Sequence, residues 1–269
     1  MRTSHRPKKR RKVATSWQNV QGWYTKTVGL KGHYYHEHII LPASLKLLNL
    51  TADSKILDLA CGQGVLGRHV DKDIYYQGID ASAAFIQFAV ENDSSIRHHY
   101  RTGDITEELP IEKKDFTHAA ILLAIQNIEN VLSVFKNVSH RLTAEGRFLV
   151  VINHPAFRIP KYTSWQIDQE KQIQYRRVDA YMSSLKIPIQ MNPSKKEESE
   201  NTWSFHHSMS FYSKYLNQAG FLIEKIEEWV SDKISVGKAA CMENQSRSEF
   251  PLFMALLARK ANYVPMHEK

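Results

Sequence analysis

Short apolar runs alternate with helix-like stretches along the central part of the chain. Apolar runs of about four to eight residues predict buried strands, whereas apolar positions three or four residues apart predict amphipathic helices. The expected strands cover residues 55–60, 74–80, 97–101, 116–123 and 147–152. The expected helices are a short one that ends at residue 70, then 83–91 and 131–142. Because strands separated by helices need crossover connections, the pattern predicts an α/β fold with a doubly wound, mostly parallel sheet.

The segments on either side of this alternation follow other patterns. Residues 16–50 are helix-like and aromatic-rich, and we expect them to form an N-terminal helical cap, with Pro42 near the start of a helix. Residues 155–205 break the alternation with prolines, a charged run and two β-like stretches, which indicates a lid inserted after the fifth strand. The remaining elements are expected at 210–220 (a helix closed by Gly220) and at 221–230 and 251–260 (two strands that bring the sheet to seven).

One domain is therefore expected over residues 16–260, between a disordered basic tail at 1–15 and a C-terminal tail at 261–269. A chain of 269 residues suits one α/β domain with a lid better than two independent domains. Hydrophobic residues make up 42% of the chain, which is enough for a sizeable core.

The net charge of +8 belongs mainly to the N-terminal tail. Residues 1–12 carry seven positive charges and no acid, so the rest of the chain is left with a net charge of +1. Pro7 to Val13 resembles a nuclear-localisation signal, and the tail could make weak contacts with nucleic acid. The chain has two cysteines, no long apolar run and no apolar stretch after the basic N-terminus. These features predict a cytoplasmic protein without a membrane span.

A glycine-rich turn follows the first expected strand, where Asp58 to Gly64 read Asp-Leu-Ala-Cys-Gly-Gln-Gly. Open α/β sheets bind ligands at the carboxyl ends of their strands, and glycines let a ligand lie against bare backbone. Residues 62–67 also satisfy the dinucleotide fingerprint, which would place a pyrophosphate on a helix N-terminus. The carboxylate of Asp58 would repel a pyrophosphate but favour the amino group and sulfonium of S-adenosylmethionine (SAM). The order of residues therefore favours SAM over NAD.

Two further acids follow the next two expected strands. Asp80 ends the second strand, where a carboxylate can accept both ribose hydroxyls of either cofactor. Asp104 follows the third strand, where it could accept the exocyclic amine of adenine. An acid at the end of the third strand has no counterpart in the dinucleotide site, so its presence favours SAM again.

These three segments, Leu57–Gly64, Gly78–Asp80 and Gly103–Ile105, resemble the successive cofactor motifs of class I SAM-dependent methyltransferases. The likeness covers roughly residues 17–260 and is closest to bacterial small-molecule members of methyltransferase types 11 and 25. Ala60 stands where many members have glycine, and Thr117 where an aspartate is frequent. The resemblance implies SAM as cofactor, bound by Tyr24, Asp58, Ala60, Gly62, Gly64, Asp80, Ala81, Asp104, Ile105, Ile121 and Leu122.

The residues that act on the methyl acceptor are less sharply defined, because methyl transfer from a sulfonium needs mainly positioning and exclusion of water. A general base is required only where the acceptor must lose a proton early. The candidates are three histidines that could lie near the methyl group: His36 in the N-terminal cap, His154 after the fifth strand and His207 after the lid. No Cys/His spacing resembles a zinc site, so no metal is expected.

The lid and the nearly neutral body favour methyl transfer to a small-molecule acceptor enclosed at the active edge. The lid's aromatic residues, Trp203 and Phe205 among them, would suit a planar or hydrophobic acceptor or would form the lid's own core. The alternative is a methyltransferase that acts on ribosomal or transfer RNA and is anchored by the basic tail. A third reading is a protein that binds SAM without catalysis. The acceptor, the methylated atom and the oligomeric state stay open at this point.

Overall fold

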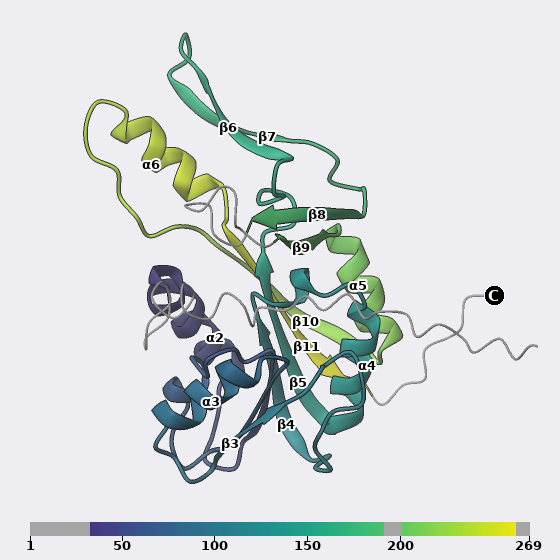
Figure 1. Cartoon of the computed structure of the whole chain (residues 1–269). Coiled ribbons are helices and arrows are strands. Elements are labelled where there is room, and N and C mark those ends of the chain that lie inside the picture. Colours follow the sequence, from purple (N-terminus) through teal and green to yellow (C-terminus); the bar gives the residue numbers. More distant parts are fainter. Residues whose placement is uncertain (1–32, 191–200, 262–269) are drawn as a thin grey trace, which may run out of the picture.

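The computed structural model describes residues 33–190 and 201–261, and its centre is a seven-stranded sheet (Figure 1). The strand order across the sheet is β10-β11-β5-β4-β1-β2-β3. Five strands are mutually parallel: β1 (Lys55–Leu59), β2 (Tyr75–Asp80), β3 (His98–Thr102), β4 (Phe116–Leu122) and β5 (Leu142–Asn153). β11 (Phe253–Lys260) runs antiparallel between β5 and β10 (Phe221–Trp229). The predicted doubly wound, mostly parallel seven-stranded sheet is thus confirmed.

Helices cover both faces of the sheet (Figure 1). On one side lie α2 (Leu41–Leu48) and α3 (Ala83–Asn92); on the other lie α4 (Val131–Arg141) and α5 (Met209–Gln218). β5 shows how the sequence serves two cores, because successive strand residues point to opposite faces. Phe148, Val150 and Ile152 pack with α4 and α5, whereas Leu149 and Val151 pack with α2. All five side chains are at most 1% exposed, which explains the continuous apolar run.

Several expected elements differ in detail from those observed. No α-helix follows the glycine-rich turn: residues 62–66 form consecutive turns, followed by a short 3₁₀ helix (η3) at Gly67–His69. β5 begins at Leu142 rather than at residue 147, so it extends the sheet directly from α4. The structure also has α6 (Ala240–Glu249), which the sequence pattern did not predict because its hydrophobic periodicity is weak. Gly220 lies beyond the end of α5 with a φ of +85°, as predicted for a helix-terminating glycine.

The N-terminal part of the described chain enters the fold through an irregular helix. His36–Ile40 (η2) form a π-helical segment that continues directly into α2. Pro42 occupies the first turn of α2, as expected, but because the π-helical segment precedes it without a break, its missing N–H leaves the preceding turn without one helical hydrogen bond. The predicted cap at 16–50 is described from residue 33 onward; its earlier part and the tails at 1–15 and 262–269 lie outside the described residues.

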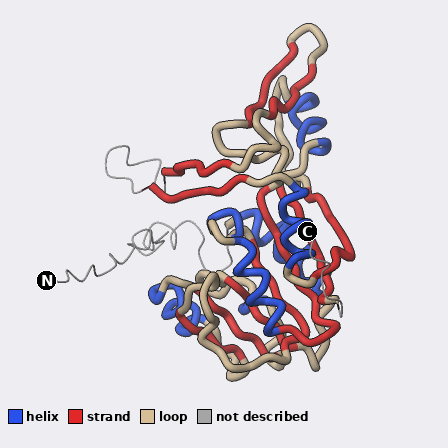
Figure 2. Tube along the Cα trace, turned by 90° about the vertical axis from the view of Figure 1, so that its right-hand side faces the viewer, coloured by secondary structure: helices blue, strands red, loops and turns tan. Residues whose placement is uncertain are grey.

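The predicted insertion contains two antiparallel hairpins (Figure 2). One pairs β6 (Thr163–Asp168) with β7 (Ile173–Val178), and the other pairs β8 (Leu185–Gln190) with β9 (Asn201–His206). Both hairpins project beyond the sheet at the same end of the molecule (Figures 1 and 2). The β8–β9 hairpin also contacts the short 3₁₀ helix η4 (Ile125–Asn127) that follows β4. The insertion therefore stands over the carboxyl ends of the parallel strands.

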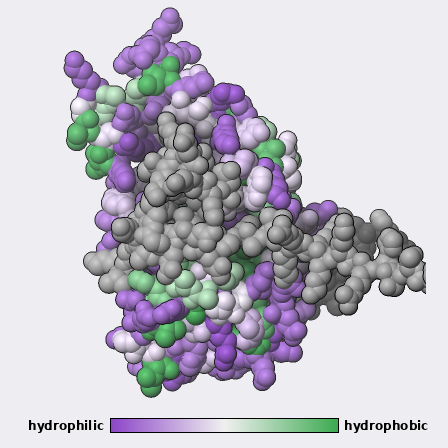
Figure 3. All heavy atoms as spheres, viewed as in Figure 1, coloured by the Kyte–Doolittle hydropathy of each residue, from purple (hydrophilic) through white to green (hydrophobic). Residues whose placement is uncertain are grey.

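Several hydrophobic side chains are exposed at this end of the molecule. Figure 3 shows mostly hydrophilic side chains on the lower body and groups of hydrophobic ones near the β6–β7 hairpin and the loop before α6. The exposed hydrophobic residues there include Ile167, Ile173, Tyr175, Ile234 and Val236. Within residues 33–190 and 201–261, no helix has both the length and the apolar character needed to cross a bilayer.

Candidate functional site

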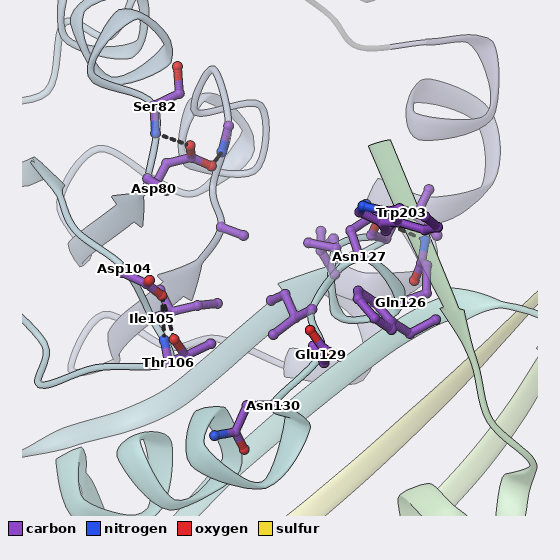
Figure 4. Close-up of a pocket in the computed structure, with 18 of the residues that line it drawn as sticks. Asp80, Ser82, Asp104, Ile105, Thr106, Gln126, Asn127, Glu129, Asn130 and Trp203 are labelled. Carbon is purple, nitrogen blue, oxygen red and sulfur yellow. Dashed lines mark hydrogen bonds between the residues drawn. The ribbon is translucent and has the colours of Figure 1, made fainter. Parts of the chain in front are cut away.

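A cavity of about 750 Å³ lies at the carboxyl ends of β1, β2, β3 and β4. Figure 4 shows two groups of side chains around it, one at Asp80 and Asp104–Thr106 and the other at Gln126, Asn127 and Trp203. The first group comes from the ends of β2 and β3, and the second from the segment after β4 and from β9. The volume falls within the range of roughly 300–1,000 Å³ that is usual for small-molecule sites.

The glycine-rich turn forms one wall of this cavity through Ala60 and Gly62. Both residues have left-handed backbone conformations, with φ values of +52° and +54°. A Cβ atom on Gly62 would meet no other heavy atom within 4 Å, so the backbone here borders open space. A ligand can therefore approach the peptide groups of the turn directly.

Asp80, the last residue of β2, holds this wall in place from the cavity side. Its Oδ2 accepts a hydrogen bond from the N–H of Gly62 (2.9 Å), and its Oδ1 accepts one from the N–H of Ser82 (2.8 Å). Burial raises the pKa of Asp80, and these two backbone hydrogen bonds work in the opposite direction. Each carboxylate oxygen keeps a second lone pair, so the group can fix the turn and still accept hydrogen bonds from a ligand.

Asp104 and Ile105 line the cavity beyond the end of β3. Oδ1 of Asp104 accepts hydrogen bonds from the backbone N–H (2.9 Å) and the hydroxyl (2.7 Å) of Thr106. These bonds orient the carboxyl group while Oδ2 has no hydrogen bond to the described residues. Ala81 and Leu122, also predicted to contact the cofactor, line the same cavity.

Asp58 does not line the cavity. It is 3% exposed, and its Oδ2 accepts a hydrogen bond of 2.5 Å from the hydroxyl of Tyr76 on β2. The alternation along β1 explains this position: Leu57 and Leu59 face α4 and α5, so Asp58 points to the opposite face, where Tyr76 lies. Burial, followed by the nearby charge of Asp80, raises the pKa of Asp58 from 3.8 to about 7, although the Tyr76 hydrogen bond opposes the shift.

This raised pKa predicts that stability falls as the pH rises. In the unfolded chain Asp58 loses its proton near its usual pKa of 3.8, whereas the folded chain keeps it up to about pH 7. The folded state therefore binds the extra proton, and stability is lost between these two values. Asp58→Asn keeps an acceptor for Tyr76. In this variant the loss of unfolding free energy between the two pKa values should be smaller by roughly 2–4 kcal/mol. Urea unfolding at several pH values measures this; an unchanged slope would contradict it, and the exposed Asp53→Asn serves as control.

Two other predicted cofactor contacts, Gly64 and Ile121, lie outside the cavity lining, and a third is not among the described residues. Gly64 packs under the turn, where a Cβ would lie 2.9 Å from the hydroxyl of Tyr100, and Gly64 does not line the cavity. Ile121 is fully buried in the core with α4 and α5, whereas its neighbour Leu122 faces the cavity. Tyr24 lies outside the described residues.

Of the three histidine candidates, His36 lines the cavity. It is the first residue of the π-helical segment, a type of irregularity that occurs frequently at functional sites. Its Nδ1 is buried and has no hydrogen-bond partner among the described residues. Burial lowers the pKa of His36 to about 4, and nearby His33 adds to the shift. The imidazole is therefore neutral at pH 7 and has a nitrogen that can accept a proton or a hydrogen bond.

His154 lies at the end of β5 but outside the cavity lining, and both of its ring nitrogens are engaged. Nδ1 accepts hydrogen bonds from the backbone N–H groups of Ala156 and Phe157 (3.2 and 3.3 Å). Nε2 therefore carries the proton and donates to Oε1 of Glu228 at 2.6 Å. Burial lowers the pKa of His154, and Glu228 offsets only part of the shift. This arrangement closes the turn after β5 and leaves no ring nitrogen for an acceptor.

His154→Ala should therefore affect stability and leave the cofactor site intact. Losing the ring leaves two backbone N–H groups and Glu228 without their partner, so unfolding should become easier by roughly 1–3 kcal/mol. Calorimetric titration with S-adenosylhomocysteine (SAH) should show an affinity like that of the original chain. His140→Ala, an exposed position on α4, is the matched control. A large loss of turnover with unchanged stability would point instead to a catalytic His154.

His207 also lies outside the cavity lining. Its ring stacks on that of Phe211, with centroids 3.6 Å apart, and its Nδ1 is 3.1 Å from the hydroxyl of Ser184. Desolvation lowers the pKa of His207 to about 4, with His206 adding to the shift. The neighbouring His206 pairs through Nε2 with the carbonyl of Tyr181. These contacts place both histidines in the packing between the insertion and α5.

The structure adds lining residues to those that the cofactor motifs and the three histidines supplied. Gln126 and Asn127 in η4, and Lys186 and Trp203 in the β8–β9 hairpin, form the wall opposite Asp80. Gln126 and Asn127 directly follow an apolar strand, a position that could have marked them. Nothing local in the sequence marks Lys186, whereas Trp203 is one of the insertion's aromatic residues that the sequence suggested for a planar acceptor.

The charges around the cavity suit a cationic ligand without phosphate. Among the described lining residues, the carboxylates of Asp80, Asp104, Glu107 and Glu129 stand against one ammonium group, that of Lys186. Carboxylates favour the sulfonium and amino groups of SAM and disfavour a pyrophosphate. The open backbone at Gly62 and the acid that ends β2 fit the same cofactor. Nowhere in the described part of the chain do three or more His, Cys, Asp or Glu side chains form a potential metal site.

Comparisons with known proteins agree with this geometry. Residues 56–146, which run from β1 into β5, match a family model described as a methyltransferase domain. An uncharacterised methyltransferase of Schizosaccharomyces pombe is 27% identical over 191 residues, which are 68% of this chain. The matched region spans 65% of that relative's own length, just under two thirds.

Solved structures show the same fold over most of the chain. A SAM-dependent methyltransferase from Mesorhizobium loti aligns with a TM-score of 0.65 and 23% identity, covering 86% of this chain and 100% of that one. A putative SAM-dependent methyltransferase from Listeria monocytogenes aligns with a TM-score of 0.64 and 22% identity, covering 82% of this chain and 97% of that one. Together these comparisons show that the chain has the fold of SAM-dependent methyltransferases and that its residues 56–146 match a methyltransferase domain.

Proposed function

We propose that this protein transfers the methyl group of SAM to a small-molecule acceptor by in-line displacement. The observation that carries the proposal is a single cavity that joins the Asp80 and Asp104 end to the Gln126 and Trp203 end. A cofactor at the first end would present its methyl group toward the second, so donor and acceptor would share one cavity. Residues 155–205, with their two hairpins, would act as the lid that excludes water.

The bound cofactor supplies an activated methyl group on a sulfonium, so the protein has to position the acceptor and, where needed, take up its proton. Asp80, Ala81, Asp104, Ile105 and Leu122 are proposed to hold the cofactor, with Ala60 and Gly62 offering bare backbone. Because Asp58 is buried below the turn, we propose that it supports the site through Tyr76 rather than by direct contact. His36 is the proposed proton acceptor, since it lines the cavity and its Nδ1 is not paired with any described residue.

The first test is binding, followed by turnover. Calorimetry with SAH should give one site per chain, and a screen of metabolite pools with methyl-labelled SAM should yield a labelled small molecule. His36→Ala should retain SAH binding but lower the turnover of an acidic acceptor by about 10²–10⁴-fold. His140→Ala should leave turnover unchanged, because this side chain is exposed on α4. If SAH fails to bind, the proposed function is wrong.

The alternative is an RNA methyltransferase anchored by the basic tail, which lies outside the described residues. Removing residues 1–12 separates the two proposals. A small-molecule enzyme should keep its turnover without the tail. An RNA enzyme should lose affinity at moderate salt, because phosphate contacts through lysine and arginine are strongly salt-dependent. A cytoplasmic location is part of the same proposal and is supported by two unpaired cysteines, Cys61 and Cys241.

A further inference from the structure

The side-chain amide of Gln126 is held in a fixed orientation at the edge of the cavity. Its Nε2 donates a hydrogen bond of 2.8 Å to the backbone carbonyl of Leu123. Rotating the amide by 180° would place two oxygens against each other, so the Leu123 carbonyl determines which end is the oxygen. Gln126 therefore presents Oε1, a hydrogen-bond acceptor, on its free side.

This oxygen lacks a partner in the described structure. Oε1 of Gln126 is buried from solvent, and neither the backbone nor any described side chain donates to it. Buried polar atoms are nearly always hydrogen-bonded, because leaving one unpaired costs free energy. Since Gln126 also lines the cavity, the missing donor is best supplied by a ligand. A ligand that fits must then carry an O–H or N–H group.

The wall next to Gln126 is aromatic. Figure 4 shows Trp203 of β9 close to Gln126 and Asn127, and Phe205 lines the cavity further along the same strand. Lys186 of β8 lies over both rings, with Nζ 5.1 Å from the Trp203 centroid and 5.4 Å from the Phe205 centroid. It is also within 3.4 Å of the carboxylate of Glu129. These contacts hold the indole in place as a flat apolar surface, which suits a planar ring.

We propose that the acceptor half of the cavity selects a planar aromatic molecule with a hydroxyl or amino group, which donates its hydrogen to Oε1 of Gln126. The ring of the acceptor lies against Trp203. This inference rests on the proposed methyl transfer and names the chemical class of its acceptor. The amide oxygen only accepts this hydrogen bond: on methyl transfer the proton would pass to His36, the proposed proton acceptor, and the methylated oxygen would no longer donate to Gln126. The same contact therefore favours release of product over substrate.

The test compares the binding of two probes, one with the hydroxyl hydrogen and one with a methyl group in its place. The protein is saturated with SAH so that the cofactor end of the cavity is filled. The probes are 2-naphthol and 2-methoxynaphthalene, and ligand-observed NMR titration gives the dissociation constant of each. The original chain should bind 2-naphthol about tenfold or more tightly than its methyl ether, because only the naphthol satisfies Oε1. Gln126→Leu should bind the two probes about equally.

Two further variants show whether the effect belongs to this contact. Gln87→Leu makes the same exchange on the exposed side of α3 and should keep the preference. Trp203→Leu should weaken both probes and leave their ratio unchanged, because the ring contact does not depend on the donated hydrogen. Circular dichroism confirms that each variant is folded.

The outcomes are distinct. Equal affinity of the original chain for both probes, or a preference that survives Gln126→Leu, overturns the inference while SAH binding still supports methyl transfer. Failure of SAH to bind overturns the proposed function, and this inference with it. Loss of the preference in Gln126→Leu alone supports the assigned acceptor class.

Discussion

Asp80→Ala is expected to weaken SAH binding by at least about 100-fold. It removes the two charge-assisted hydrogen bonds that the carboxylate is proposed to accept from the ribose hydroxyls of the cofactor, each worth roughly 1.5–3 kcal/mol. The same change releases the N–H groups of Gly62 and Ser82, which the carboxylate ties together across the cavity wall. The variant therefore loses both a ligand contact and the fixed shape of the turn. Calorimetric titration with SAH measures the effect directly.

Asp80→Asn helps to separate these two contributions. The amide keeps one oxygen that can accept a backbone N–H, but its NH₂ group faces the other donor and the charge is lost. We expect an affinity between those of the original chain and Asp80→Ala. Asp53→Ala, an exposed position in the turn before β1, is the control for removing a carboxylate. If Asp80→Ala bound SAH as tightly as the original chain, the proposed cofactor site would be wrong.

Gly64→Ala is expected to destabilise the fold much more than Gly62→Ala, although both glycines have left-handed backbones. A Cβ on Gly64 would lie 2.9 Å from the hydroxyl of Tyr100 and 3.0 Å from the Cβ of Ala89. The Tyr100 hydroxyl donates to Asp93 at 2.6 Å and has little freedom to move. Overpacking of this kind adds about 1–3 kcal/mol to the roughly 1 kcal/mol that alanine costs in a left-handed conformation.

When SAH binding is measured, the order should reverse: Gly62→Ala should lose more affinity than Gly64→Ala. On Gly62 the new methyl group projects into open space beside the cavity, so it should weaken SAH binding with a small loss of stability. Urea unfolding together with calorimetry gives both quantities for each variant. Equal loss of stability in the two variants would show that the packing around Gly64 adapts to an extra methyl group. Equal SAH affinity in the original chain and Gly62→Ala would place the cofactor away from this turn.

The strand pattern was predictable where strands such as β1, β2 and β11 are buried on both faces, whereas the edge strands β3 and β10 are largely exposed. Apolar runs such as that of β5 therefore appear as continuous segments in the sequence, and their order along the chain determines the crossovers. The antiparallel pair at the C-terminal end of the sheet was also predictable from two late apolar runs. The short helix expected up to residue 70 is a single 3₁₀ turn, and α6 was not predicted, because glycine-rich turns and weakly periodic segments carry little local signal.

The chemical motifs were predictable as positions at the ends of strands, but the direction of each side chain was not. Asp58 and Asp80 both belong to cofactor motifs, yet the alternation along β1 turns Asp58 toward Tyr76, whereas Asp80 ends β2 at the cavity. Among the histidines, His36 reaches the cavity through an irregular helix, while His154 is held in the turn after β5. A sequence pattern does not show which ring nitrogens are already paired.

By itself the sequence determined the sheet, the edge at which ligands bind, and a turn that suits SAM better than a pyrophosphate. These features depend on local periodicity and on residue types at strand ends, which neighbouring residues are enough to specify. The tertiary structure alone decided the acceptor wall, because Gln126 and Trp203 are far apart in the chain and meet only when the β8–β9 hairpin packs against η4. Contacts between distant segments depend on how the whole chain packs, so no local pattern encodes them.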